Sequence, residues 1–310
     1  MTLTEEPPAG QLDPLPAKKE LNLQSIVLIG ALHVVALYAA WHAFRSPPSV
    51  KVWIVFLVMW VVPQLGITVG YHRMETHNGF KVRPWVRAVL LLFGGMAVQG
   101  EVNGWVLNHR VHHHFEDQPG LDMHTPLEYH GLKGLLWAHM GWLLVKYERP
   151  PQFRVSARMD ADPLVRWQRK WYLAIAAASF VIPWAAAGWD GLLVAGFLRV
   201  VFVLHVTWSV NSVCHKWGRP AKDSQGTEYL GDDSRNNRLV QVLGLGEGYH
   251  ANHHAQPASA FHGWERYSFD PSKWTIQGLE RLGLAWGVRR PKTDLVFKSS
   301  QVEDRAAGAA

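Results

Sequence analysis

Apolar residues of this chain gather in four long stretches that are separated by polar segments. The stretches cover about residues 25–44, 52–70, 171–187 and 191–213. Each approaches the roughly 20 apolar residues that a helix needs to cross a bilayer. A short Pro-containing link, RSPPSVK, joins the first two, and a turn around Trp189 and Asp190 joins the last two. The pattern predicts an all-α integral membrane protein with four transmembrane helices in two hairpins.

A further apolar run covers residues 85–107, but it is interrupted by Gly94, Gly95, Gln99, Glu101 and Asn103. A fifth membrane span there would invert the orientation of everything that follows. We expect instead a helix that lies in or under the membrane interface.

Lys and Arg are frequent between the two hairpins and after the last span, whereas the two hairpin turns carry few of them. Cytoplasmic loops carry such an excess. The distribution therefore predicts that both termini and a helical cap, residues 71–170 and 214–290, are cytoplasmic. The expected membrane domain is 23–290, with disordered tails at 1–22 and 291–310. The first residues lack the basic start and apolar core of a signal peptide.

The net charge of +6 fits these basic loops. No basic patch interleaved with aromatic residues indicates a nucleic-acid partner. Cys214 is the single cysteine, so the chain forms no internal disulfide, which fits a reducing compartment.

Histidines recur in four motifs near the same ends of the predicted spans. The motifs contain His72 and His77; His109, His112 and His113; Asn211 and His215; and His250, His253 and His254. In H-x-x-H-H the three imidazoles share one helix face, as do Asn211 and His215. The first pair is five residues apart and is expected to straddle a helix end. Because the motifs lie on one predicted membrane face, they can meet in the cap.

Imidazole ligands suit Zn, Cu, Fe and Ni. A structural zinc site closes with four ligands, and nine histidines exceed that number. They are enough for two metals with open positions, and a single cysteine excludes an iron–sulfur cluster. The pattern favours two irons that activate O2. We interpret the remaining histidines as non-ligands, with His139 at most supporting the site: His33, His42, His114, His124, His130, His139, His205 and His262.

The motifs GITVGYHRMETH, NHRVHHHFEDQPG, HMGWLLVK, NSVCHKWG, DDSRNN and GEGYHANHHAQPASA stand in this order over residues 66–289. The chain thereby resembles the membrane acyl desaturases, in the branch of the stearoyl-CoA and bacterial delta-9 enzymes. The resemblance implies two Fe2+ ions held by the nine histidines of the four motifs, with Asn211 holding a water on one iron. It also implies that Gln99, Trp105 and Thr207 bend the acyl tunnel beside the irons.

Positions for the acyl carrier depart from the animal enzymes. Leu107 and Gly100 replace an Arg and an Asn that approach coenzyme A, and Lys146 alone remains of a basic pair. Acyl-CoA is the first expectation, with acyl carrier protein or a lipid as alternatives. Trp60 and Gln64 share the face of His72 on the second span, at positions that match the closed end of the tunnel. Their size predicts a short tunnel, unless they face another helix.

The resemblance implies an O2-dependent desaturase that introduces a cis double bond into a saturated fatty acyl chain. Two electrons would come from a separate donor such as ferredoxin, rubredoxin or a b-type cytochrome. The alternatives are an alkyl or acyl hydroxylase, an olefin-forming decarboxylase with similar motifs, and a non-enzymatic metal transporter. Transporters place their ligands at the bilayer midplane, whereas these motifs lie at span ends.

Overall fold

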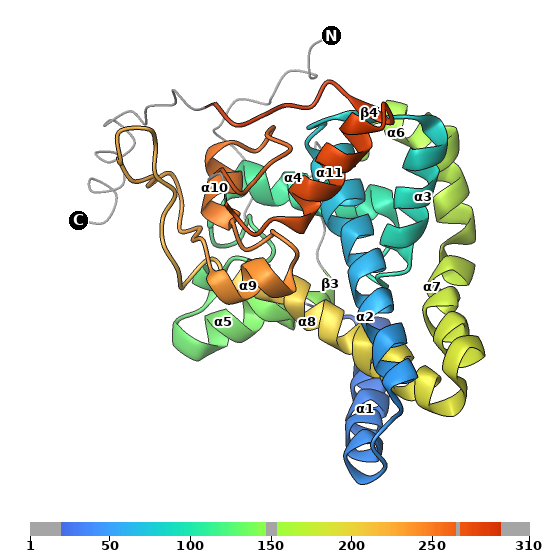
Figure 1. Cartoon of the computed structure of the whole chain (residues 1–310). Coiled ribbons are helices and arrows are strands. Elements are labelled where there is room, and N and C mark those ends of the chain that lie inside the picture. Colours follow the sequence, from blue (N-terminus) through green and yellow to red (C-terminus); the bar gives the residue numbers. More distant parts are fainter. Residues whose placement is uncertain (1–19, 147–153, 265–266, 293–310) are drawn as a thin grey trace.

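A computed structural model describes residues 20–146, 154–264 and 267–292. The chain is mostly helical (Figure 1). The tails expected at 1–22 and 291–310 lie almost entirely outside the described residues.

Long helices form the lower part of the molecule in Figure 1. Three helical runs in the described part of the chain are long and apolar enough to cross a membrane: Leu23–Arg45, Val50–Thr76 and Pro163–Ser212. The first is α1. The second consists of α2 (Val50–Leu65) and a π-helix, η1 (Gly66–Thr76). The third consists of α7 (Pro163–Asp190), a π-helix η4 (Gly191–Leu198) and α8 (Arg199–Ser212).

The third run contains both stretches predicted for the second hairpin. Its backbone leaves helical geometry at Ala187 (φ −141°) and at Gly188 (φ 62°, ψ −147°). A positive φ costs glycine little, because it has no Cβ. Beyond this break η4 packs against α7. A Cβ on Gly191 would lie 2.1 Å from the carbonyl oxygen of Pro183, so only glycine permits this close approach.

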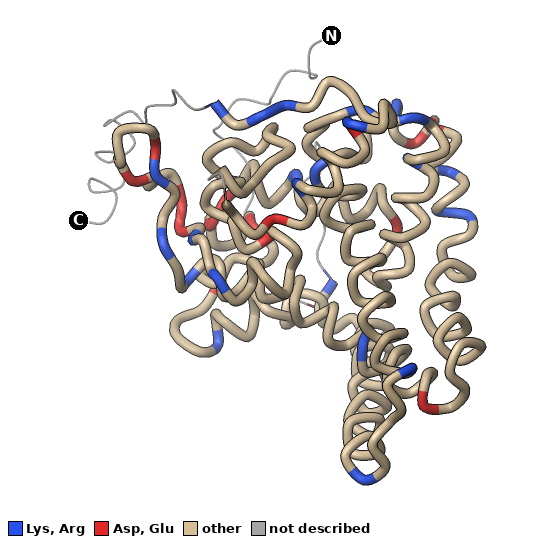
Figure 2. Tube along the Cα trace, in the orientation of Figure 1, with Lys and Arg blue, Asp and Glu red and all other residues tan. Residues whose placement is uncertain are grey.

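The surfaces of these helices are apolar. Leu37, Phe44 and Leu173 are 72%, 83% and 81% exposed, and few charged positions interrupt the long helices in Figure 2. Extended apolar surfaces of this kind are rare on soluble monomers. The helices therefore have the length and the surface of membrane-embedded segments.

The apolar run at residues 85–107 is not the single interfacial helix that we expected. It forms α3 (Pro84–Gly95) and the start of α4 (Val102–Phe115). Between them the chain turns, with positive φ at Val98 (60°) and Gly100 (99°). Pro84 suits the first turn of α3, where its missing N–H is not needed. The turn changes the direction of the chain, so that α4 enters the cap.

The remaining elements are short and build the cap around α4 and α10 (Figure 1). Two antiparallel strand pairs, β1 with β3 and β2 with β4, connect distant parts of the chain. The elements are β1 (Glu20–Leu21), β2 (Lys81–Val82), η2 (Pro126–Glu128), α5 (Gly131–His139), η3 (Gly141–Leu144), β3 (Val145–Lys146), α6 (Ala157–Ala161), α9 (Arg238–Leu243), α10 (His250–Ala255), α11 (Pro271–Arg281) and β4 (Ala285–Trp286).

Candidate metal centre

Five imidazoles from three distant parts of the chain converge in a first group. Their ligand nitrogens lie within 4.8 Å of one another: His72, His77, His109, His113 and His253. His113 Nε2 and His253 Nε2 are 2.8 Å apart, and His72 Nε2 and His253 Nε2 are 3.0 Å apart. The Nε2 atoms of this group therefore face a common centre.

The π-helical geometry of η1 explains the five-residue spacing of the first pair. A π-helix has i→i+5 hydrogen bonds and is often found at functional sites. Here the backbone N–H of His77 donates to the carbonyl oxygen of His72 at 3.2 Å. His77 immediately follows η1, as the expected position at a helix end requires. The wider turn brings both rings to one side, with centroids 5.0 Å apart.

Four further imidazoles form a second group, all buried: His112, His215, His250 and His254. His215 Nε2 lies 2.9 Å from His250 Nε2. Each H-x-x-H-H helix contributes to both groups. Helix α4 gives His109 and His113 to the first and His112 to the second, whereas α10 gives one residue to the first and two to the second.

Carboxylates bind the outer ring nitrogen, Nδ1, of five of these histidines. The pairs are His72 with Glu247 (2.5 Å), His112 with Asp122 (2.9 Å), His215 with Asp117 (3.0 Å), His113 with Glu116 (3.1 Å) and His254 with Asp232 (3.1 Å). An ionised carboxylate can only accept, so each Nδ1 carries the hydrogen and, in the neutral ring, Nε2 presents a lone pair. Metal-bound histidines show this arrangement.

Lone pairs that face one another in a buried site repel unless a cation lies between them. The residues present therefore fit a metal in each group. Sequence reasoning did not single out the five carboxylates. Four of the five stand in or near the motifs: Glu116 and Asp117 follow the second motif closely, Asp232 lies in DDSRNN, and Glu247 precedes His250 by three residues.

The electrostatics of the two histidine groups also fit metal binding. Burial lowers the pKa of His109 and His253 well below the usual value, and neighbouring histidines lower each further. These rings are therefore neutral near pH 7, as metal ligands must be. Burial would also lower the pKa of His254, but Glu116 and Asp232 raise it to about 10. The acidic surroundings of the second group thus favour a positive charge there.

A buried ion network supports the first group. Arg73 is fully buried, and its guanidinium donates to Asp270 at 3.1 Å and to Glu247 at 3.3 Å. Glu247 thus joins Arg73 to His72. Because both partners fix its carboxylate, Glu247 can hold the His72 ring in one orientation.

Six of the eight histidines outside the two groups occupy three kinds of place. His124 and His262 are buried beside the centre, not merely in polar stretches: the ring of His262 is 4.5 Å from that of His253. His33, His205 and His139 form a separate hydrogen-bonded chain between α1, α8 and α5, ending at Ser212. His42 lies far from the centre, bound to Asp190 at 2.8 Å.

A cavity of about 380 Å³ reaches from α1 to the first group. Leu28, Leu32 and Leu204 provide apolar walls. Residues expected at the tunnel and the centre also line it: Gln99, Trp105, Thr207, His109 and Asn211. Gln99 Nε2 donates to Thr207 Oγ1 at 2.8 Å, and Trp105 Nε1 donates to Gln99 Oε1 at 3.3 Å. These bonds fix the shape of the wall.

Three residues that the sequence suggested for the tunnel end or the acyl carrier do not line this cavity. Trp60 donates from Nε1 to the carbonyl oxygen of Leu243 at 3.3 Å and packs edge-on against Phe202. Gln64 is buried in α2. Lys146 is exposed in β3, with Nζ 4.0 Å from a carboxylate oxygen of Glu20.

The long apolar helices are those of a membrane protein. The buried histidine groups beside an apolar cavity form a metal-compatible site next to a space for an apolar chain. The family model described as fatty acid desaturase matches residues 47–267. The chain belongs to the fatty acid desaturase family. It is an oxidoreductase that acts on fatty acyl chains in membranes.

Curated relatives extend this comparison. An sn-1 stearoyl-lipid 9-desaturase of Anabaena variabilis is 35% identical over 88% of this chain and 95% of its own length. An icosanoyl-CoA 5-desaturase of Limnanthes douglasii is 34% identical over 87% and 73%. Stearoyl-CoA desaturase 5 of Bos taurus is 29% identical over 90% and 84%.

Proposed function

We propose that this protein is an O2-dependent di-iron desaturase that introduces a cis double bond into a saturated acyl chain. The observation that carries this proposal is the apolar cavity that ends at His109, beside two adjoining groups of buried imidazoles. Nine histidines would hold two Fe2+ ions, with Asn211 acting through a water. The bound irons would supply O2 activation and the removal of two hydrogens from neighbouring methylenes.

The chain's own residues position the substrate and the ligands. Apolar walls bind the acyl chain by burial, at about 0.8 kcal/mol for each CH2. The hydrogen bonds between Gln99, Thr207 and Trp105 keep the wall in one shape, so one carbon–carbon bond can be held beside the centre. The carboxylates on Nδ1 keep the ligand nitrogens directed inward.

The proposed domain covers 23–290, with four spans in two hairpins. The break at Ala187 and Gly188 supports this count, because the third long run packs back on itself there. By the excess of Lys and Arg in the middle segment, both termini and the cap with the metal centre are cytoplasmic.

Acyl-CoA is the proposed carrier, because Lys146, three residues after Leu143 of the cavity wall, keeps one cation of the basic pair expected for it. The relatives' names include both acyl-lipid and acyl-CoA desaturases. Parallel assays with stearoyl-CoA, stearoyl-acyl carrier protein and a stearoyl lipid separate the carriers. Electrons come from a separate protein such as ferredoxin, rubredoxin or a b-type cytochrome.

Product analysis tests the reaction. The purified protein, loaded with Fe2+, is given a saturated substrate, O2 and a reductant, and its products are analysed by gas chromatography–mass spectrometry. We expect a cis-alkenoyl product and two irons per chain. An alcohol would indicate a hydroxylase, and an alkene one carbon shorter would indicate a decarboxylase. Metal uptake into vesicles without O2-dependent turnover would indicate a transporter.

A further inference from the structure

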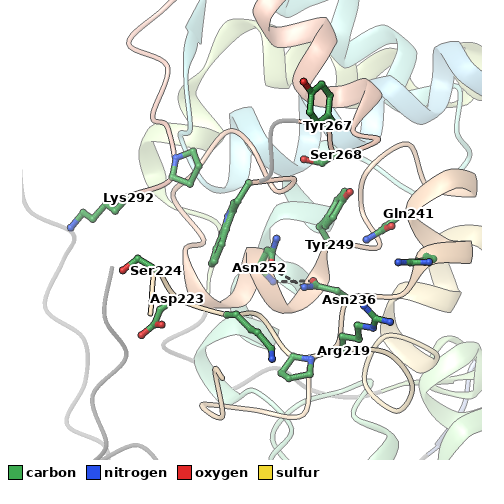
Figure 3. A pocket seen from close by; sticks show the side chains of 15 residues that line it. Arg219, Asp223, Ser224, Asn236, Gln241, Tyr249, Asn252, Tyr267, Ser268 and Lys292 are labelled. Atoms are coloured by element: carbon green, nitrogen blue, oxygen red, sulfur yellow. Dashed lines mark hydrogen bonds between the residues drawn. The ribbon is translucent and has the colours of Figure 1, made fainter. Parts of the chain in front are cut away.

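A second cavity, of about 590 Å³, opens on the cap (Figure 3). None of its lining residues lines the acyl cavity. Four cations line it, Arg219, Lys222, Arg238 and Lys292, against one acid, Asp223. The cavity is therefore basic, whereas the acyl cavity is largely apolar.

Two residues at the back of this basic cavity are sequence neighbours of metal-centre histidines. Tyr249 precedes His250, and Asn252 precedes His253. Figure 3 shows Asn252 bound to Asn236; Asn236 Nδ2 donates to Asn252 Oδ1 at 2.8 Å. Since α10 gives ligands to both groups, the cavity adjoins both halves of the centre from a side that the acyl chain does not use.

The exposed cations at the rim leave positive charge available for a binding partner. Lys222 pairs with Glu228 at 3.3 Å. Arg219 and Arg238 are exposed and form no ion pair with any residue that the structure describes. The aromatic residues Trp264, Tyr249 and Tyr267 line the same cavity. Arg, Trp and Tyr are the residue types that dominate binding energy at protein interfaces.

We propose that this basic cavity is the docking site for the small acidic redox protein that supplies electrons to the centre. The proposal rests on the proposed desaturase function. The atoms and electrons of the proposed desaturation balance. The acyl chain gives up two hydrogens, and the docked donor supplies two electrons one after the other. With two protons from solvent, these convert one O2 to two waters. Complementary charge favours such an acidic partner and speeds its encounter with the enzyme.

Charge reversal at the rim tests this assignment. The double variant Arg219→Glu/Arg238→Glu is compared with Arg158→Glu/Arg166→Glu, which changes two exposed arginines of α6 and α7 by the same charge. Reduced plant-type ferredoxin, rubredoxin and cytochrome b5 are offered as electron donors. The donor that gives the highest turnover with the unmodified enzyme is then used for all variants. Dithionite with methyl viologen serves as a chemical reductant.

We expect the cavity variant to raise the KM for the donor protein by roughly tenfold or more and to flatten the decline of kcat/KM with salt. Its iron content and its turnover with chemical reductant should match the unmodified enzyme, and the control variant should behave normally throughout. The neutral variant Arg219→Gln/Arg238→Gln should give an intermediate KM, and it replaces the charge reversal if that protein loses iron.

Three results would overturn the docking site. One is an unchanged KM for the donor in the cavity variant. Another is a raised KM for acyl-CoA instead, which would assign the cavity to the carrier's nucleotide. The third is turnover with chemical reductant but with none of the three proteins. Absence of a double bond with every reductant would instead remove the desaturase function itself.

Discussion

Asp117 accepts a hydrogen bond from Nδ1 of His215 at 3.0 Å, and it does so from a left-handed backbone, with φ at 56°. The same carboxylate accepts from the backbone N–H of Asp233 and from Thr125 Oγ1. Burial would raise the pKa of Asp117, but His215, His112 and the backbone N–H of Asp233 hold it well below its usual range. The carboxylate is therefore ionised, and it fixes the hydrogen of His215 on Nδ1.

Replacing this carboxylate should weaken metal binding. Asp117→Asn keeps the shape and tolerates positive φ, but it removes the charge that orients His215. We expect iron affinity to fall by roughly 10–100-fold, measured by chelator competition and elemental analysis. Asp160→Asn, at an exposed carboxylate bound to Arg169, is the matched control. Equal iron retention in the two variants would show that Asp117 does not orient a ligand.

Ligand removal should separate the two metal positions. His253→Ala removes a ligand of the first group and His112→Ala one of the second, so each protein should hold about one iron and lose activity. His42→Ala is the control, because its bond to Asp190 lies far from the centre and is worth at most about 1 kcal/mol. Full desaturation by either ligand variant would refute the di-iron assignment.

Stability should depend on the buried ion network. In Asp270→Ala the fully buried Arg73 loses two of its contacts and keeps only Glu247 and a carbonyl. Removing one partner from a buried ion network leaves two guanidinium hydrogens without acceptors and should cost about 3–5 kcal/mol. Thermal unfolding in detergent would show a markedly lower midpoint than Asp160→Ala. Equal unfolding midpoints for the two variants would show that Arg73 has found other partners.

Reporter fusions test the proposed four spans. A reporter placed after Pro48 should lie outside the cytoplasm, and reporters at Arg158 and at the C-terminus should lie inside, because one span separates Pro48 from Arg158 and two spans separate Arg158 from the C-terminus. Protease protection of the same fusions is an independent control. Reporters at Pro48 and Arg158 on the same side of the membrane would contradict the four-span arrangement.

The short-tunnel hypothesis remains a prediction. Trp60 packs edge-on against Phe202, with centroids 5.3 Å apart, and Gln64 is buried. If they close the tunnel, the double variant Trp60→Ala/Gln64→Ala should accept acyl chains longer by a few carbons. Products from a series of chain lengths measure this, with His42→Ala as the control. Unchanged products, together with mid-chain desaturation of eighteen-carbon substrates by the unmodified enzyme, would contradict the hypothesis.

Local patterns in the sequence were sufficient for the family and for the helical character of the chain. Apolar stretches are readable because each residue in a membrane helix meets lipid or another apolar surface regardless of distant partners. The H-x-x-H-H motifs are readable because three imidazoles on one helix face need only local geometry. The carboxylates Asp122 and Glu247 were not found, since nothing in their own neighbourhood indicates which histidine they bind.

The sequence by itself determined the apolar helices, the family and the nine histidines that gather in one region. Tertiary structure decided how they are used. It divided the imidazoles of α4 and α10 between two groups, and it formed η1 as a π-helix that brings His72 and His77 together. Each of these features depends on contacts between segments far apart in the chain, whose free energy no local window of sequence contains.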